Sequence, residues 1–84
     1  MKPVDPWDKM SESERSVMVL YATEHLRAMM RETMAERHHY EESGEQESRS
    51  KAVDRLRREC DATRDGLAIA VKNMCDRVHN REKK

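Results

Sequence analysis

The chain has 84 residues, of which 40% are charged and 36% hydrophobic, and its seventeen basic and seventeen acidic side chains leave no net charge. A chain of this length forms one domain, 1–84, with a small core. Its longest apolar segments, 17–22 and 67–71, are far shorter than the roughly 20 residues that cross a membrane. Residues 1–6 lack the apolar core of a secretory leader, so we expect a cytoplasmic protein.

Residues that break helices are scarce, with two Gly and two Pro, and Phe is absent. Sheets joined by tight turns need more such residues, so the composition predicts an all-helical fold. Charge divides the chain into halves: residues 1–47 carry six basic and eleven acidic side chains, a net −5, and residues 48–84 carry eleven and six, a net +5. Opposite net charges attract when two segments lie side by side.

Residues 1–10 are predicted to form a short arm. Asp5 can cap one helical turn, and Pro6 suits the first position of that turn because its ring fixes a helical φ angle. Trp7 is the only Trp of the chain. We expect its large ring to dock either on the helices or on a partner.

The first long helix is predicted over residues 11–41. Ser11 and Glu14 form a capping box, in which each side chain accepts a hydrogen bond from the backbone N–H of the other. Apolar or neutral residues then recur at steps of three and four, the spacing that keeps one helix face toward a neighbour. That predicted face consists of Val19, Ala22, Leu26, Met29 or Met30, Thr33 and Tyr40.

A turn is predicted over residues 42–47, because Gly44 can adopt the left-handed conformation that ends a helix. The second helix is predicted over 48–80 and is followed by a tail, 81–84. Its repeat stays in phase across Gly66, so we expect one continuous helix, with a kink at Gly66 as the alternative. The predicted face follows a coiled-coil spacing and consists of Val53, Leu56, Cys60, Thr63, Leu67, Ala70, Met74 and Arg77.

Folding the chain at the turn brings the two faces together in antiparallel order, with the numbers of opposing residues summing to about 89. Apolar or neutral residues then meet in every layer: Val19 with Ala70, Ala22 with Leu67, Leu26 with Thr63, Met29 with Cys60, and Thr33 with Leu56. The sequence therefore predicts an all-α, antiparallel two-helix hairpin with a short N-terminal arm. The alternative is one long helix, or an open V, that pairs only with a second chain.

The open end of this hairpin has more apolar surface than two helices can cover. Six successive apolar residues, 17–22, span more than a full helical turn at 100° each. Large exposed apolar patches usually mark contacts, so we expect a homodimer, built as a four-helix bundle, and contact with another protein. The predicted contact residues are Trp7, Val17, Leu20, Tyr21, Leu67, Ile69, Val71 and Val78.

No residue pattern indicates catalysis: the chain has no Gly-rich phosphate loop and no arrangement of Ser, His and Asp typical of a hydrolase. His38 and Glu42, like Cys75 and His79, are four residues apart, but a zinc site needs three or four ligands. Cys60 lies on the predicted face and is expected to pack as a small hydrophobe. We therefore expect no enzyme activity, no metal and no cofactor.

The sequence thus favours a cytoplasmic regulatory protein, an antagonist or inhibitor, that binds another protein through an apolar helical surface. Two alternatives remain: a small helical chaperone or structural bundle subunit, and a dimeric nucleic-acid-binding regulator. The second alternative rests on a basic strip at the start of the second helix, which acidic residues dilute and which has no Asn to read a base edge. Its candidate contacts are Arg49, Lys51, Arg55, Arg57 and Arg58.

Overall fold

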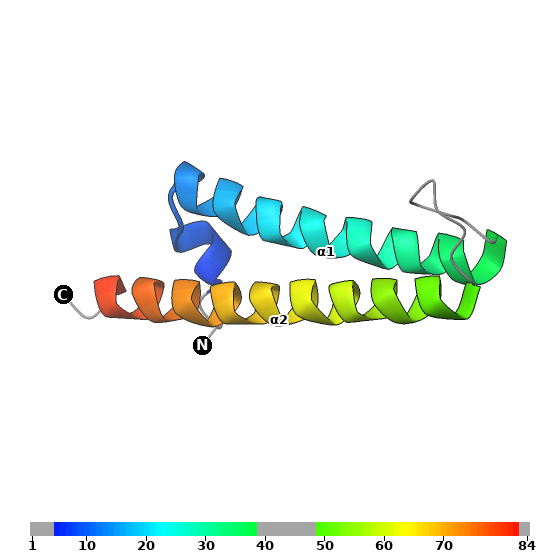
Figure 1. Ribbon diagram of the computed structural model, residues 1–84. Helices are drawn as coiled ribbons and strands as arrows, with labels where there is room; N and C mark the ends of the chain where they lie inside the picture. Colours follow the sequence, from blue (N-terminus) through cyan, green and yellow to red (C-terminus); the bar gives the residue numbers. More distant parts are fainter. Residues whose placement is uncertain (1–4, 39–48, 83–84) are drawn as a thin grey trace.

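The computed structural model describes residues 5–38 and 49–82. They form a short 3-10 helix, η1 (Pro6–Lys9), and two long helices, α1 (Glu12–His38) and α2 (Arg49–Glu82). The two long helices lie side by side and antiparallel, with η1 at their open end (Figure 1). The molecule measures 57 × 21 × 19 Å. The predicted all-helical, antiparallel hairpin is confirmed.

The predicted caps are confirmed at both helix starts. The Asp5 side chain accepts a hydrogen bond from the Trp7 backbone N–H at 3.0 Å, and Pro6 follows at the first position of η1. The Ser11 backbone N–H donates to Glu14 Oε1 at 2.9 Å, while the Glu14 backbone N–H donates to Ser11 Oγ at 3.2 Å. These reciprocal bonds satisfy backbone donors that the first turn of α1 would otherwise leave free.

The helix bounds differ from the prediction at the C-terminal end. α2 runs without interruption through Gly66 to Glu82, two residues beyond the predicted end at residue 80. The last turn of α2 persists because Arg81 reaches across to an acidic partner at the start of α1. The predicted turn, 42–47, and the predicted end of the first helix at residue 41 lie outside the described residues.

The predicted face of α2 is largely confirmed. Leu56 and Met74 are buried, and the predicted residues between them are half-buried. The last position is wrong, because Val78 is buried and Arg77 is exposed. Val78 packs in a cluster with Met10 of the arm, Met18 of α1 and Met74. It therefore occupies the buried position that the predicted repeat gave to Arg77.

The predicted face of α1 is wrong by one residue. Val19, Ala22, Leu26, Met29 and Thr33 are all exposed. The residues of α1 that meet α2 lie one position before the predicted ones, which corresponds to a rotation of the helix by about 100° about its axis. They are Glu14, Met18, His25, Ala28, Glu32 and Ala35. The predicted apolar layers between the helices therefore do not form.

The antiparallel register, by contrast, is confirmed. The His25 ring contacts the Thr63 hydroxyl, and Arg57 of α2 binds Glu32 of α1. The residue numbers in these pairs sum to 88 and 89, as predicted. The prediction thus placed the helices correctly along their length but rotated α1 wrongly about its axis, because polar residues of α1 have partners on α2.

Two small clusters hold the helices together. At the open end, Met10 inserts beside Met18, Met74 and Val78, and α1 diverges from α2 there, toward η1 (Figure 1). Toward the other end the buried residues are Ala28, Ala35, Ala52 and Leu56. Leu56 is the largest side chain that is fully buried among the described residues. Alanines let the helices approach closely but bury little apolar area.

Gly66 offers a direct test of the packing. No atom outside its own helix backbone lies within 4 Å of the place where a Cβ would stand. A Gly66→Ala substitution should therefore raise the free energy of unfolding by about 1 kcal/mol, because Ala favours a helix interior over Gly by that amount. Urea unfolding measures the change, and Ala68→Gly at an exposed position of α2 should lower stability similarly. A destabilised Gly66→Ala protein would show that another backbone needs this space.

Candidate protein-binding surface

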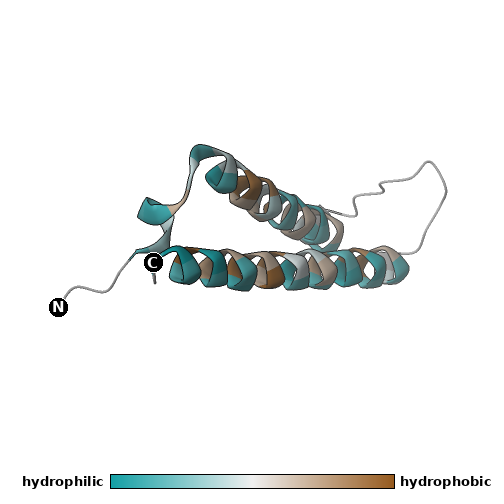
Figure 2. Cartoon of the chain, turned by 90° about the vertical axis from the view of Figure 1, so that its left-hand side faces the viewer, coloured by the Kyte–Doolittle hydropathy of each residue, from teal (hydrophilic) through white to brown (hydrophobic). Residues whose placement is uncertain are grey.

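More large hydrophobic side chains are exposed than buried in the part of the chain that the structure describes. Buried ones number five, Met10, Met18, Leu56, Met74 and Val78. In Figure 2 the hydrophobic residues of α1 are concentrated just after its first turn, near the open end of the hairpin. The exposed set comprises Trp7, Val17, Val19, Leu20, Tyr21, Leu26, Met29, Met30, Met34, Ile69 and Val71. Contiguous exposed apolar surface is commonly found at contact sites of proteins.

Part of this surplus forms a regular band on α1, which we call the α1 stripe: Val19, Ala22, Leu26, Met29 and Met30. All of these residues are exposed, with Val19 and Leu26 each 52% accessible. Their spacing is that of a coiled-coil seam, to which Met30 adds one flanking position. The next position of the same repeat, Thr33, is uncharged, although 40% of the chain is charged.

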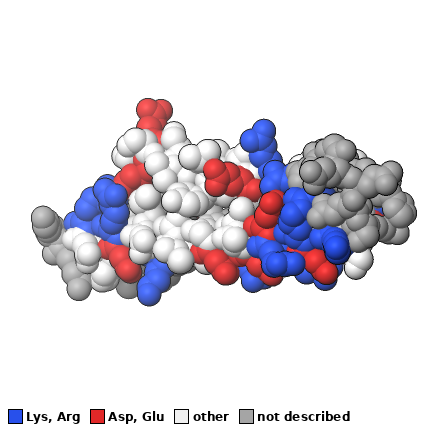
Figure 3. Space-filling view, viewed as in Figure 1, with Lys and Arg blue, Asp and Glu red and all other residues white. Residues whose placement is uncertain are grey.

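A second apolar feature adjoins the stripe and is called here the Trp7 groove. It has a volume of about 420 Å³ and lies between α1, α2 and η1. Its lining consists of Pro6, Trp7, Met10, Met18, Val19, Ala22, Leu67, Val71, Met74 and Cys75. The face seen in Figure 3 shows uncharged side chains over the middle of the hairpin and charged ones concentrated toward the turn end.

Trp7 is held in place at the end of this groove. Arg15 of α1 donates a hydrogen bond from Nε to the Trp7 carbonyl at 3.0 Å, and its guanidinium carbon lies 5.7 Å from the centre of the Trp7 ring. Asp5 binds the Trp7 backbone N–H from the other side. Trp7 as a whole is nevertheless 45% exposed. A large aromatic ring that is fixed and still accessible is a typical anchor of protein interfaces.

Glu14 fastens the open end of the hairpin. Its carboxylate accepts a hydrogen bond from Arg81 Nη2 at 2.9 Å, and Arg77 Nε lies 3.5 Å from the other oxygen. The hydrogen bond from the Ser11 backbone N–H, together with Arg81, lowers the pKa of Glu14 below its ordinary value of 4.5. The cap was predicted, but the ion pairs of Glu14 with Arg77 and Arg81 were not. The acidic start of α1 and the basic end of α2 are the sequence signal for these pairs.

A polar layer crosses the middle of the hairpin. The Thr63 hydroxyl donates its hydrogen to the Cys60 carbonyl at 2.9 Å, so His25 Nδ1, at 3.0 Å, must donate to the Thr63 oxygen. Burial raises the pKa of the Cys60 thiol. Cys60 therefore packs as a small hydrophobe and does not have the properties of a reactive thiol.

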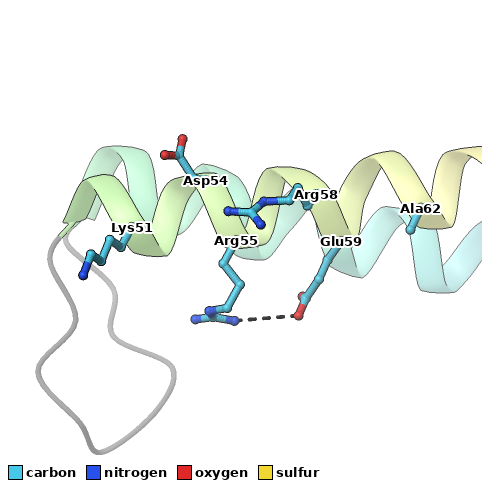
Figure 4. Close-up of a pocket in the computed structure, with 6 residues that line it drawn as sticks. All are labelled: Lys51, Asp54, Arg55, Arg58, Glu59 and Ala62. Atoms are coloured by element: carbon cyan, nitrogen blue, oxygen red, sulfur yellow. Dashed lines mark ion pairs between the residues drawn. The ribbon is translucent and has the colours of Figure 1, made fainter.

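The basic strip of α2 is largely engaged with acidic residues. Arg57 binds Glu32 at 3.0 Å and Glu36 at 2.9 Å, both on α1. Arg55 lies 3.7 Å from Glu59 of its own helix, and Figure 4 shows Asp54 and Glu59 among the basic side chains. Among the other predicted nucleic-acid contacts, Lys51 also interacts with other groups of the protein. Arg58 is exposed. The Arg49 side chain lies outside the described residues.

The predicted protein contacts are only partly brought together. Trp7, Leu67 and Val71 line one groove. Val17, Leu20, Tyr21 and Ile69 are exposed but lie outside it, and Val78 is buried in the hairpin core. None of the α1 stripe is among the predicted contacts, because its residues were expected to face α2.

Among residues 5–38 and 49–82 there is no group of three side chains that could hold a metal. Cys75 and His79 are both exposed on α2, while the His38 side chain and Glu42 lie outside the described residues. No described helix is long and apolar enough to cross a membrane.

Comparison with known protein families, curated proteins and solved structures finds no match. The function is therefore argued from the surface of the molecule.

Glu14→Gln tests the clamp at the open end. The Gln amide oxygen can still accept the bond that caps α1, but its attraction to Arg77 and Arg81 is lost, so the free energy of unfolding at pH 7 should fall. The folded state lowers the pKa of Glu14. The contribution of the Glu14 charge to the free energy of unfolding is therefore complete above pH 4.5 and disappears as the pH falls through the lowered pKa. The stability difference should shrink over the same pH range.

Urea unfolding of both proteins from pH 7 to pH 3 measures this difference. Glu12→Gln is the matched control, because Glu12 is an exposed acid in the same helical turn. Equal loss of stability in the Glu12 and Glu14 variants would contradict a specific clamp.

Proposed function

We propose that this chain is a small regulatory protein without catalytic activity that binds and modulates another protein, as an antagonist, through the Trp7 groove. We further propose that it works as a homodimer in a four-helix bundle. The observation that carries the proposal is a preformed apolar groove beside Trp7, whose backbone is held by Asp5 and Arg15 and whose ring lies 5.7 Å from the Arg15 guanidinium carbon.

The chemistry of the groove favours a polypeptide partner. Its lining is apolar apart from the Cys75 thiol, and the volume of about 420 Å³ suits a few large side chains. An amphipathic helix places such side chains at steps of three and four along one face, and grooves between helices commonly bind that pattern. Because Trp7 is already ordered, little conformational entropy is lost when the partner binds.

The same lining supports binding over catalysis. General acid–base chemistry most often uses a His, a carboxylate or a Lys near the reacting atoms. The groove lining includes none of these, and the Cys75 thiol is its one titratable side chain. Nucleic-acid binding needs cations that are available to phosphate, whereas Arg57 is held by Glu32 and Glu36. The free thiols of Cys60 and Cys75 suit the reducing conditions of the cytoplasm, where we place the protein.

Val71→Glu tests the proposal, with Lys72→Glu on the next, exposed position of α2 as the control. A charge at Val71 enters the groove, so the partner captured from an extract of the native cell should bind at least tenfold more weakly, a loss of about 1.4 kcal/mol. Lys72→Glu should retain full affinity.

Titration of the purified pair measures both affinities, and circular dichroism verifies that the two variants remain helical. Equal affinity of the Val71→Glu protein would refute the groove assignment. If the captured molecule is a nucleic acid that is lost on replacing Arg55, Arg57 and Arg58 by Ala, the regulatory protein-binding function is wrong.

A further inference from the structure

We infer that the α1 stripe is the seam of a two-fold contact between two copies of this chain, in which the two α1 helices run antiparallel with Leu26 of one copy opposite Ala22 of the other. The inference rests on the proposed homodimer and specifies its geometry. The seam shares Val19 and Ala22 with the groove lining, whereas Leu26 lies outside the groove, so substitutions at Leu26 and at Val71 test the two surfaces separately.

The stripe has the pattern of a second helix–helix seam. α1 already meets α2 through Met18, His25, Ala28 and Glu32. One position later, Val19, Ala22, Leu26 and Met29 repeat the same spacing on an adjacent face. A helix with seams on two adjacent faces is the normal constituent of a four-helix bundle, where every helix packs against two neighbours.

The stripe is complementary to itself. In the antiparallel arrangement centred near residue 24, Val19 meets Met29 of the second copy, and Ala22 meets Leu26. The two-fold axis repeats both pairs, which gives four successive apolar layers. Small residues face large ones in the two central layers, as close packing requires. Arg15 and Thr33 flank the seam at each end.

Other arrangements fit less well. A shift by one heptad places Val19 opposite Glu36 and Ala22 opposite Thr33, which leaves only the two layers between Leu26 and Met29 apolar. A parallel arrangement opposes each residue to itself, so the alanines meet in one layer and the leucines in another, and the Arg15 side chains of both copies lie together. Like charges and unequal layers both disfavour that arrangement.

The size and charge of the face suit a second copy. From residue 15 to residue 33 the seam is about 27 Å long at 1.5 Å per residue, and the hairpin is 21 Å wide. If the flanking side of α2 joins the contact, as in a four-helix bundle, the projected area is on the order of 550 Å². The accessible area of a corrugated surface is larger, close to the ~800 Å² per partner of a standard interface. Helix α1 carries five acidic and four basic side chains, a net −1, so two copies of it repel each other little.

This geometry connects the dimer to the Trp7 groove. Val19 and Ala22 belong both to the stripe and to the groove lining. Met29 of the second copy would rest on Val19 and complete the groove wall next to α1. The two grooves of the dimer lie toward opposite ends of the bundle, each beside an exposed Trp7 ring.

Distances between spin labels test the register. A single Cys is introduced as Ser16→Cys or as Arg37→Cys, both exposed, in a chain whose own cysteines are replaced by Cys60→Ala and Cys75→Ser. Pairing centred at residue 24 separates the two labels along the helix axis by about 24 Å at position 16 and about 39 Å at position 37, from 1.5 Å per residue.

The heptad-shifted arrangement reverses this order, with about 35 Å at position 16 and about 29 Å at position 37. A parallel dimer gives about 10 Å at both positions. Either pattern overturns the proposed register. If no dipolar signal is seen and the mass is that of a monomer, the dimer is overturned as well. The affinity of the Val71→Glu protein for its partner remains an independent test of the groove.

Leu26→Glu supplies a second test, and Leu20→Glu is its matched control. Both side chains are more than half exposed, but Leu20 lies outside the stripe. Sedimentation equilibrium should show that Leu26→Glu is monomeric at a concentration where the wild type and Leu20→Glu are dimers, with helicity unchanged. Dimers of Leu26→Glu, or monomers only of Leu20→Glu, would overturn the assignment of the α1 stripe.

Discussion

The rotation of α1 about its own axis is the constraint on which the rest of the structure depends. Three polar contacts along the helix fix it: Glu14 with Arg81 at the open end, His25 with Thr63 in the middle, and Glu32 with Arg57 toward the turn. A single exposed ion pair contributes little stability. Distributed over the length of one helix, however, these contacts oppose any rotation that would bring Val19 or Leu26 toward α2.

This rotation leaves a hairpin with a small core. Its buried apolar residues form a methionine-rich cluster at the open end and a group of three alanines with Leu56 toward the other end. Chains of this size are marginally stable when their core is small, and oligomerisation is one common source of additional stability. The α1 stripe and the Trp7 groove are the surfaces on which association would add buried area, so in the proposed account folding and binding are coupled.

The sequence was sufficient for the helices, their caps and their register. Ser11 and Glu14 identified the start of α1, Asp5 and Pro6 that of η1, and the repeat of α2 identified most of its buried side. Each of these signals is local, or follows from one uninterrupted periodicity, and does not require knowledge of the neighbouring helix.

The rotation of α1 could not be obtained in this way. Periodicity identifies an apolar face, but it does not say whether that face meets α2 or another molecule. Charge carried part of the missing signal: Glu32 lies opposite Arg57 once the antiparallel register is known, and Glu36 follows one helical turn later on the same face. Of the predicted contact residues, Trp7, Leu67 and Val71 line the Trp7 groove, and none belongs to the α1 stripe.

The central claim is that the hairpin exposes more apolar surface than it can keep from water by itself. Thermal unfolding of the unmodified chain at two concentrations that differ 100-fold tests it most directly, because only an associated native state is stabilised by concentration. The account predicts that the Tm rises by several degrees at the higher concentration. A Tm independent of concentration, with a mass of 10.0 kDa at both, would contradict it.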